Sequence, residues 1–263
     1  MKIGVFDSGV GGFTVVRELL ELVPDIPVIY FGDTARSPYG TKSKDTLVRY
    51  AMEDAEFLLA HGATVIVIAC HSAASTASDI LKDKLAIPVL EVISPSVEQA
   101  CTLTKNKRIG LIGTRATISS SIYSKKIPEK LPEAKLFQQP CPLLVPLVEE
   151  GWLKRRETRM IVKRYLRPLK DKQIDTLILG CTHYPLLKDV IQEKAGKRIR
   201  IVDPSHEVAR QVATVARRYG KGPNHLRDSS FSQDNRFFVS DLTPHTEAIV
   251  TSFLGQKVRL ERA

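Results

Sequence analysis

The chain has 263 residues, of which 43% are hydrophobic and 26% are charged, and its formal net charge is +10. These values are ordinary for a soluble globular enzyme, and the length allows one large domain or two smaller ones with a substantial core. The first apolar segment meets Asp7 too soon for a signal peptide, and no apolar run approaches the ~20 residues that a membrane-spanning helix needs. We therefore expect a cytoplasmic protein with no membrane partner.

Strand-like and helical segments alternate along most of the chain. The expected strands are Ile3–Phe6, Val28–Phe31, Thr64–Ala69, Val89–Leu90, Arg108–Ile112, Ala134–Phe137, Thr176–Leu179 and Ile199–Val202. The expected helices are Phe13–Leu22, Lys44–His61, Ala73–Leu85, Pro95–Thr104, Ala116–Ser124, Pro142–Glu150, Arg155–Leu169, Pro185–Lys194 and Glu207–Tyr219. Near-continuous apolar strands that alternate with helices predict parallel sheets covered by helices on both faces.

The end of the chain adds a short further unit. The polar segment Gly220–Gln233 is predicted to be a loop. After it, Arg236–Ser240, a helix over Pro244–Leu254 and Val258–Leu260 form a small β-α-β unit.

Two segments repeat one pattern, in which an apolar strand runs directly into a cysteine. Cys70 follows Val65–Ala69, and Cys181 follows Thr176–Gly180; hydroxyl and imidazole side chains and a helical segment come next in both cases. The carboxyl end of a buried parallel strand is where open α/β sheets bind ligands, and a nearby helix N-terminus favours a thiolate. The pair suggests two acid/base groups that face one substrate from opposite sides.

Because these two segments lie in separate halves of the chain, we expect an α/β protein made of two similar doubly wound parallel-sheet domains, with the active site in the cleft between them. Residues 1–94 and 206–263 are assigned to the first, discontinuous domain. Residues 95–205 are assigned to the second.

A glycine-rich turn, Asp7-Ser8-Gly9-Val10-Gly11-Gly12, follows the first strand and precedes a helix. Its glycines allow backbone amides to approach an anionic ligand, although the spacing is not that of a dinucleotide-binding loop. Asp7 stands out as an acid directly after a buried strand, but an ordinary capping or turn role remains open for it. The loops Gly32–Gly40 and Gly113–Thr117 occupy similar strand ends and suit a small polar ligand.

The remaining cysteines, Cys101 and Cys141, are interpreted as small buried hydrophobic residues. The four cysteines are far apart, with no C-x-x-C pair and no zinc spacing, so neither a metal site nor a disulfide framework is expected.

Lysine and arginine are concentrated between Lys154 and Lys172, where nine of them accompany two acids. Apolar residues recur there at helical spacing (Met160, Ile161, Tyr165 and Leu166), which predicts an amphipathic helix with a basic face in solvent. A charge run alone is most often a solvated face. A binding module for nucleic acid or another acidic macromolecule is therefore an alternative function, and it leaves the two strand-cysteine segments unexplained.

Taken together, these motifs resemble the cofactor-independent aspartate/glutamate racemase superfamily, and within it the glutamate racemases. The resemblance extends from Gly4–Gly12 through Tyr30–Arg36 and Pro38-Tyr39-Gly40 to Leu179–Leu186, and so covers nearly the whole chain. It implies racemisation of L- and D-glutamate by two cysteines without a cofactor, which supplies D-glutamate for peptidoglycan. A homodimer is also expected.

The resemblance assigns roles residue by residue. Cys70 and Cys181 are the two acid/base groups, with Asp7 as the partner of Cys70 and His183 as the partner of Cys181. Cys70 is expected to deprotonate D-glutamate and Cys181 L-glutamate. A glutamate after the Cys-Pro stretch also matches, either Glu149 or Glu150, with Glu150 preferred. The implied substrate contacts are Asp7, Ser8, Tyr39, Gly40, His71, Ser72, Thr114, Thr117, Thr182 and His183.

One position departs from the family pattern, which has Asn-Thr after the first cysteine where this chain has His71-Ser72. Ser72 keeps the hydroxyl, whereas His71 adds bulk and a group that titrates near neutrality. Protonation of His71 would then alter substrate binding or the thiolate character of Cys70. Alternatively, His71 fills space and hydrogen-bonds to the backbone. The departure leaves open a racemase of aspartate or another acidic amino acid. A superfamily hydrolase, decarboxylase or isomerase that uses one cysteine is a further alternative.

Overall fold

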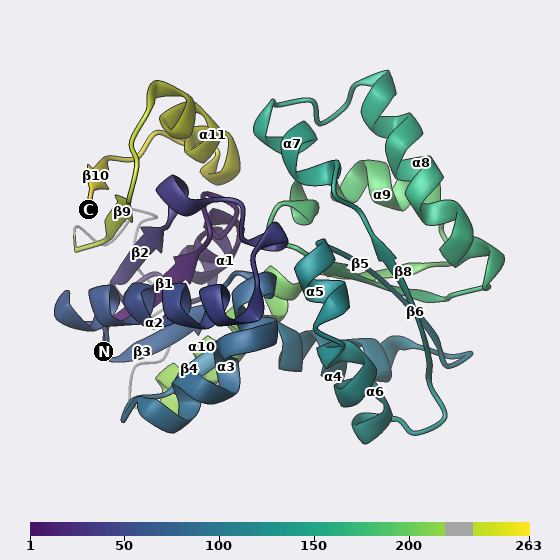
Figure 1. The fold of residues 1–263 in the computed structure, drawn as a ribbon, viewed down its shortest axis with the longest axis horizontal. Coiled ribbons are helices and arrows are strands. Elements are labelled where there is room, and N and C mark those ends of the chain that lie inside the picture. The colour runs from purple at the N-terminus through teal and green to yellow at the C-terminus, as the bar shows by residue number, and fades with distance from the viewer. Residues whose placement is uncertain (219–233) are drawn as a thin grey trace. The chain divides into compact units, whose positions relative to one another are not determined.

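The computed structural model describes residues 1–218 and 234–263 and contains two compact units. Unit 1 comprises Met1–Val92 and Ser205–Ala263, and unit 2 comprises Ile93–Pro204. Figure 1 shows both units and labels their helices and strands. The predicted domain boundaries, after residues 94 and 205, lie within two residues of these divisions. The assignment of these units as two separate domains stays a prediction.

Unit 1 is built on a six-stranded sheet in the order β10-β9-β2-β1-β3-β4. Its strands are β1 (Ile3–Asp7), β2 (Val28–Gly32), β3 (Val65–Ile68), β4 (Val89–Glu91), β9 (Arg236–Val239) and β10 (Leu260–Arg262). Every pairing is parallel, and each residue of β1, β2 and β3 is buried. A strand with both faces covered has no solvent side, which explains the unbroken apolar runs.

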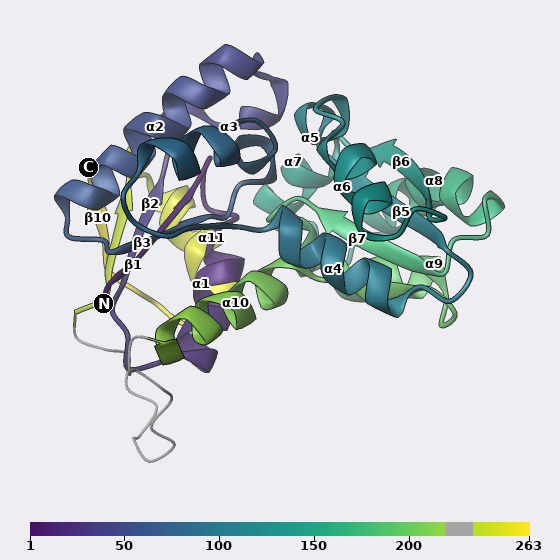
Figure 2. The same ribbon diagram turned by 90° about the horizontal axis from the view of Figure 1, so that it is seen from below.

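Helices cover both faces of this sheet. They are α1 (Phe13–Leu22), α2 (Lys44–Ala60), α3 (His71–Lys84), α10 (Pro204–Arg218) and α11 (Pro244–Leu254). Figure 2 shows α2 and α3 on one face and α1 and α10 on the other. Ser43 caps α2 by accepting a hydrogen bond from the backbone N–H of Thr46 at 3.4 Å, which satisfies one of the free amides at the start of that helix.

Unit 2 has a four-stranded parallel sheet in the order β6-β5-β7-β8. Its strands are β5 (Arg108–Gly113), β6 (Lys135–Pro140), β7 (Thr176–Gly180) and β8 (Arg200–Val202). Its helices are α4 (Ile93–Leu103), α5 (Arg115–Ser119), α6 (Ile122–Lys130), α7 (Leu144–Glu149), α8 (Arg156–Asp171) and α9 (Lys188–Ala195). The α4/α6 pair packs on one face and the α8/α9 pair on the other (Figure 1).

The predicted α/β class with two parallel sheets is confirmed, and most element boundaries differ from prediction by one or two residues. The predicted helix Ala116–Ser124 is wrong as one element: it is divided between α5 and α6 because Ser121 adopts a left-handed backbone conformation with φ of 58°. The segment Tyr184–Leu187 is a 3₁₀ helix that precedes α9. The predicted loop Gly220–Gln233 lies outside the described residues.

In residues 1–218 and 234–263, none of the helices has the length and apolar character needed to cross a membrane.

Candidate active site

In each sheet, the order in which the chain adds strands reverses direction between two neighbouring strands. In unit 1 the chain passes from β1 to β2 on one side and then to β3 on the other side of β1. The carboxyl ends of β1 and β3 therefore lie at a topological switch point, where open α/β sheets form a crevice. Asp7 ends β1, and Cys70 follows β3 after a single intervening residue.

Unit 2 repeats this arrangement. The chain passes from β5 to β6 and then to β7 on the opposite side of β5. Thr114 follows β5 directly, and Cys181 follows β7 directly. The two sequence patterns that contain cysteine thus occupy equivalent positions in two sheets of the same topology. We call the predicted site residues of unit 1 the Cys70 cluster (Asp7, Ser8, Tyr39, Gly40, Cys70, His71 and Ser72) and those of unit 2 the Cys181 cluster (Thr114, Thr117, Glu149, Cys181, Thr182 and His183).

Cys70 is the N-cap residue of α3 and is buried, with 4% of its surface exposed. The free backbone N–H groups and the positive end of the helix dipole at this position favour a thiolate. Asp7 is fully buried, and its Oδ2 accepts a hydrogen bond from the backbone N–H of Gly9 at 3.1 Å. Asp7 therefore forms a local turn and does not cap α1, whose N-cap is Gly12.

Gly12 and Gly32 lie so close to neighbouring atoms that neither position has room for a Cβ. A Cβ on Gly12 would lie 2.6 Å from the Cβ of Asp7, and a Cβ on Gly32 would lie 2.2 Å from the carbonyl oxygen of Gly9. Tyr30 Oη donates a hydrogen bond to that same carbonyl at 2.7 Å. These contacts fix the backbone that carries Asp7, a role that the sequence analysis had not given to the glycines.

His71 differs from both sequence-based interpretations. Its side chain is buried, and burial lowers the pKa of the imidazole to about 3, so the ring is neutral near pH 7. The expectation that His71 titrates near neutrality is therefore wrong. Within the described residues neither ring nitrogen has a hydrogen-bond partner, so the alternative of a backbone-bonded filler is also wrong. A neutral imidazole offers one donor and one acceptor.

Tyr39 is buried, and its hydroxyl group contacts other side chains of the protein. Its Oη contacts the carboxylate oxygens of both Asp33 and Asp54. A substrate contact by this residue would therefore come from its backbone, next to the half-buried Gly40. Ser8 is half-buried, and Ser72 lies buried in the first turn of α3.

The Cys181 cluster contains a chain of three groups. Cys181 Sγ lies 3.9 Å from His183 Nδ1, and His183 Nε2 lies 3.2 Å from Glu149 Oε1. Burial disfavours a charged imidazole, but the hydrogen bonds to Cys181 and Glu149 outweigh it and raise the pKa of His183 to about 10. His183 is therefore cationic near pH 7.

This geometry differs from the preference for Glu150, and the catalytic role of either glutamate stays a prediction. Glu149 is the residue that contacts His183, whereas Glu150 is exposed at the C-cap of α7. Two successive residues at a helix end point in different directions, since each residue advances the helix by about 100°.

Three threonines complete the Cys181 cluster. Thr114 caps α5 by accepting a hydrogen bond from the backbone N–H of Thr117 at 3.2 Å, and the two hydroxyl oxygens are 3.0 Å apart. Thr117 is buried, and Thr182 Oγ1 lies 3.4 Å from His183 Nδ1.

The other two cysteines differ from each other. Cys141 is buried, as expected, and burial followed by the neighbouring charge of Cys181 raises the pKa of its thiol. Cys101 is only half-buried, so its interpretation as a core residue is wrong. Among the residues that the structure describes, no group of three or more His, Cys, Asp or Glu side chains is arranged to hold a metal ion.

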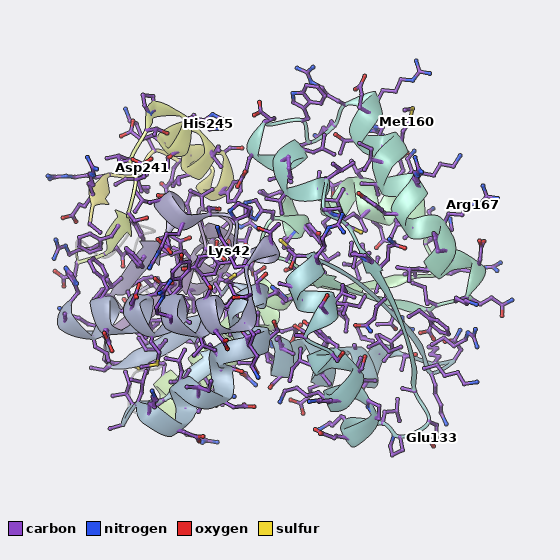
Figure 3. All side chains as sticks on the ribbon, viewed as in Figure 1. Lys42, Glu133, Met160, Arg167, Asp241 and His245 are labelled. Carbon is purple, nitrogen blue, oxygen red and sulfur yellow. The ribbon has the colours of Figure 1, made fainter. Side chains whose placement is uncertain are left out.

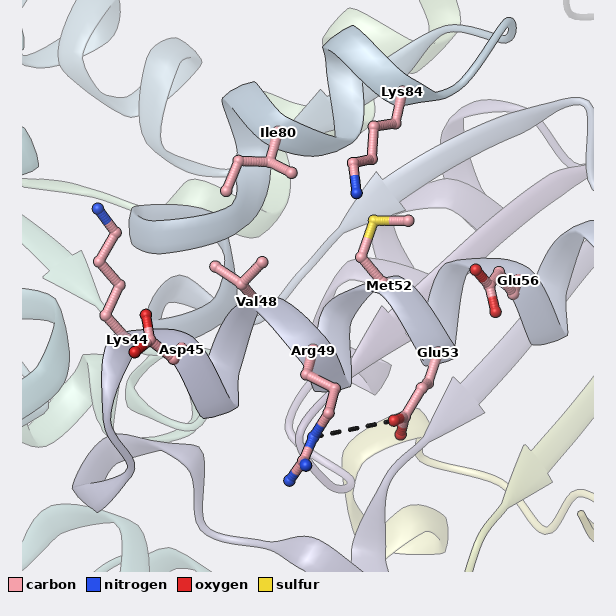
Figure 4. Close-up of a pocket in the computed structure, with 9 residues that line it drawn as sticks. All are labelled: Lys44, Asp45, Val48, Arg49, Met52, Glu53, Glu56, Ile80 and Lys84. Carbon is pink, nitrogen blue, oxygen red and sulfur yellow. Dashed lines mark ion pairs between the residues drawn. The ribbon is translucent and has the colours of Figure 1, made fainter.

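Two surface features lie outside these clusters. The predicted basic helix is α8, and Figure 3 labels Met160, which is 56% exposed, and Arg167 on its outer side. A surface hollow of about 680 Å³ lies between α2 and α3 and includes Asp45, Arg49, Glu53 and Lys84 (Figure 4).

Sequence reasoning missed one group of residues near Tyr39. Asp54 on α2 is fully buried, although its side chain is a carboxylic acid. The signal was present: Asp54 falls on the apolar stripe of its helix, which also contains Leu47, Ala51, Ala55 and Leu58.

The chain matches the Asp/Glu/hydantoin racemase family over residues 3–212. It is 44% identical over 256 residues to a glutamate racemase from Geobacter metallireducens, covering 97% of this chain and 93% of that protein. It is 45% identical over 255 residues to one from Neisseria meningitidis, with the same two coverages.

Solved structures give the same relationship. A glutamate racemase from Bacillus anthracis superposes with a TM-score of 0.92 at 35% identity, covering 100% of this chain and 97% of that chain. A glutamate racemase from Francisella tularensis, solved in complex with D-glutamate, has a TM-score of 0.89 at 34% identity and the same coverages.

Proposed function

The chain belongs to the Asp/Glu/hydantoin racemase family, and from that membership and the two cysteine clusters we propose that it interconverts L- and D-glutamate without a cofactor. The relatives named above, which are covered over at least 93% of their length, are glutamate racemases. D-glutamate produced in this way would supply peptidoglycan synthesis.

The chemistry of the reaction needs two bases. The α-proton of an amino acid is a very weak acid, so a desolvated and well-positioned thiolate is required to remove it. Inversion then requires that a different proton reaches the opposite face of the same carbon. We assign these steps to Cys70 and Cys181, one from each unit: one acts as the thiolate base and the other as the thiol acid, and their roles exchange with the direction of reaction.

The polar partners have distinct roles in this scheme. His183, cationic and in contact with Cys181, stabilises negative charge on that sulfur and exchanges a proton with it. Asp7, at the neighbouring strand end in unit 1, is the matching proton carrier for Cys70. Hydroxyl donors from Ser72, Thr117 and Thr182 stabilise the charge that develops beside the substrate carboxylate.

The observation that carries this proposal is the equivalent position of the two cysteines at the switch points of two sheets with the same topology. The decisive experiment follows the circular dichroism of L-glutamate and, separately, D-glutamate incubated with the purified protein. Both signals are expected to decay to zero, with or without a chelator or a carbonyl reagent. Stable signals for both enantiomers would refute the proposal, and inhibition by either reagent would refute cofactor independence.

Substrate choice is tested in the same assay. We propose glutamate over aspartate because the relatives named above are glutamate racemases. Aspartate is expected to racemise far more slowly, and a faster reaction with aspartate would overturn the assignment. The homodimer also remains a proposal, and analytical ultracentrifugation tests it.

A further inference from the structure

Asp54 lies on the side of α2 that packs against the core. It is fully buried and belongs to the same helical stripe as Leu47, Ala51 and Leu58. A carboxyl group in such surroundings is costly unless hydrogen bonds satisfy it, and an ionised one costs far more than a neutral one. The protonation state of Asp54 is therefore fixed by the groups that contact it.

Three side chains surround this carboxyl group and form, with it, the Asp54 cluster (Asp33, Arg36, Tyr39 and Asp54). Asp54 Oδ2 lies 3.0 Å from Tyr39 Oη, and Arg36 Nη2 donates a hydrogen bond to Asp54 Oδ1 at 3.1 Å. Tyr39 Oη also contacts Asp33 Oδ2. One phenol oxygen is thus shared between two carboxyl groups.

The number of protons available to Tyr39 and the two carboxyl groups determines which group donates in each contact. A phenol has one proton to donate, so it cannot make a full hydrogen bond to each of two ionised carboxylates. Burial raises the pKa of Tyr39 most strongly, and the neighbouring carboxyl groups of Asp54 and Asp33 do not reverse this, so the phenol keeps its proton. Both contacts are satisfied when Tyr39 donates to one carboxylate and the other carboxyl group, itself protonated, donates to Tyr39 Oη.

The remaining donors decide which carboxyl group is ionised. Asp33 accepts from Arg36 Nε at 2.5 Å and from Ser240 Oγ at 3.1 Å, in addition to Tyr39. Among the residues that the structure describes, Asp54 has a single donor besides Tyr39, the Nη2 of Arg36. Donors stabilise an anion, so the negative charge belongs on Asp33 and the proton on Asp54.

The charges around Asp54 agree with this assignment. Burial and then the charge of Asp33 raise the pKa of Asp54 well above its usual value, against smaller lowering effects of Tyr39 and Arg36. Glu53, next to it on α2, raises the pKa further. Tyr30 on β2 and Cys70 before α3 are further ionisable groups that interact with this cluster.

The guanidinium group of Arg36 does not pair with Asp54 alone. Its Nη1 pairs with Glu53, its Nε pairs with Asp33, and its guanidinium lies 4.0 Å from the centre of the Tyr50 ring. Glu53 is on the solvent side of α2, where Figure 4 shows it paired with Arg49. One cation is thus shared among three acids, of which Asp33 and Asp54 are both buried. The buried acid with fewer donors, Asp54, is the one left neutral.

The cluster is connected to the Cys70 cluster through the segment Ser37–Thr41. The 3₁₀ helix Tyr39–Thr41 packs against α3, whose first turn contains His71 and Ser72. At the other end of the segment, Ser37 lies against Gly9, whose Cβ, if present, would be 3.3 Å from Ser37 Oγ. The position of Tyr39 therefore sets the position of backbone that borders Asp7 and Cys70.

We propose that Asp54 is a protonated carboxylic acid that donates a hydrogen bond to Tyr39 Oη and so positions the Ser37–Thr41 segment beside Cys70. Asp54 is thus a positioning residue for substrate binding. The protonation state is independent of the activity of the protein, whereas the effect on substrate binding rests on the proposed function.

The first experiment measures the proton directly. Infrared difference spectra between the native protein and Asp54→Asn, near neutral pH, are expected to show loss of one carbonyl stretching band of a protonated carboxylic acid. Asp45→Asn, the same substitution at an exposed position of α2, is the matched control and is expected to remove no such band. An unchanged band in Asp54→Asn would overturn the proposal, whatever reaction the protein catalyses.

The second experiment separates positioning from folding. Asp54→Asn keeps a donor for Tyr39 Oη, whereas Asp54→Leu keeps the volume and removes the donor. For Asp54→Leu we expect KM for D-glutamate to rise about tenfold, as for loss of one hydrogen bond, with kcat reduced less than about threefold. Asp54→Asn is expected to restore KM to within about twofold of the native value.

Each kinetic outcome decides a different point. Equal KM values for the Asn and Leu variants would overturn the positioning role. Loss of the infrared band without any glutamate racemisation by the native protein would refute the proposed function and leave the protonated Asp54 in place. Thermal unfolding of both variants identifies a Leu variant that fails to fold, in which case the band in the Asn variant decides.

Discussion

The two units place a cysteine at the same point of the same sheet topology, but they surround it with opposite electrostatics. In unit 2, His183 contacts Cys181 and is cationic near pH 7, because Cys181 and Glu149 raise its pKa to about 10. In unit 1, the imidazole next to Cys70 belongs to His71, and burial lowers its pKa to about 3. Asp7, an acid, lies at the neighbouring strand end.

The difference shows that position and protonation are set by separate features. Strand order places a side chain at a switch point, and this depends on apolar residues that lie far from the chemistry. The charge of an imidazole depends on its burial and on the few groups that contact it. The two thiols are therefore expected to be equivalent in position but different in the groups that exchange protons with them.

The largest expected effect comes from removing either thiol. Cys70→Ser and Cys181→Ser are each expected to lower racemisation at least about a thousandfold in both directions, because each turnover uses both groups. Proton exchange is expected to separate them: in D₂O, Cys181→Ser should exchange the α-proton of D-glutamate, and Cys70→Ser that of L-glutamate, without inversion. NMR of recovered substrate measures this. A single variant with near-native rates in both directions would refute the two-base scheme.

The partners of Cys181 give the next largest effects. His183→Asn is expected to lower kcat from L-glutamate about a hundredfold, as for loss of a general acid/base group. Glu149→Gln is expected to lower it roughly tenfold, because one hydrogen bond to a charged group is weakened. Steady-state kinetics tests both.

Glu150→Gln is the matched control for Glu149→Gln, since it makes the same change at the adjacent, exposed position. Its rate is expected to stay within about twofold of the native value. A larger effect for Glu150→Gln than for Glu149→Gln would return the site role to Glu150.

The two histidines are expected to affect stability in opposite pH ranges. The folded-state pKa of His183 is raised. Its contribution to the free energy of unfolding is therefore fully present below about pH 6.5 and is lost as the pH rises through about 10. The folded-state pKa of His71 is lowered, so its contribution is present above about pH 6.5 and is lost as the pH falls through about 3. The steepest slope for one group is about 1.4 kcal/mol per pH unit.

Urea unfolding of His71→Asn and His183→Asn at acidic, neutral and alkaline pH measures these contributions. His71→Asn is expected to remove part of the acid-side loss of stability, and His183→Asn part of the alkaline-side loss. Parallel stability curves for the native protein and both variants would contradict the difference between the two clusters.

The smallest expected effect concerns catalysis by His71→Asn. Because the pKa of His71 is lowered to about 3, its protonation does not contribute to the pH–rate profile near neutrality. The shape of that profile is expected to be the same for the native protein and the variant. A shift of the acidic limb in His71→Asn would show that His71 titrates in the working range.

The sequence by itself determined the fold class, the strand ends and the two cysteine positions. Buried parallel strands must be apolar along their whole length, so a run such as Val65–Ile68 is visible without a structure, and so is the residue that follows it. Helical spacing of apolar residues placed most helix boundaries to within one or two positions. The left-handed conformation of Ser121 was not predicted, since nothing in the chemistry of serine forces that conformation.

Only the tertiary structure decided which groups meet and which carry protons. The choice between Glu149 and Glu150 depends on helix rotation at the end of α7, which periodicity does not fix to one residue. Asp54 was visible as an acid on an apolar stripe, but its partners Asp33 and Tyr39 come from another segment of the chain. The charge states of His71 and His183 follow from burial and contacts, which are properties of the folded chain because desolvation and hydrogen bonding arise only when distant residues pack together.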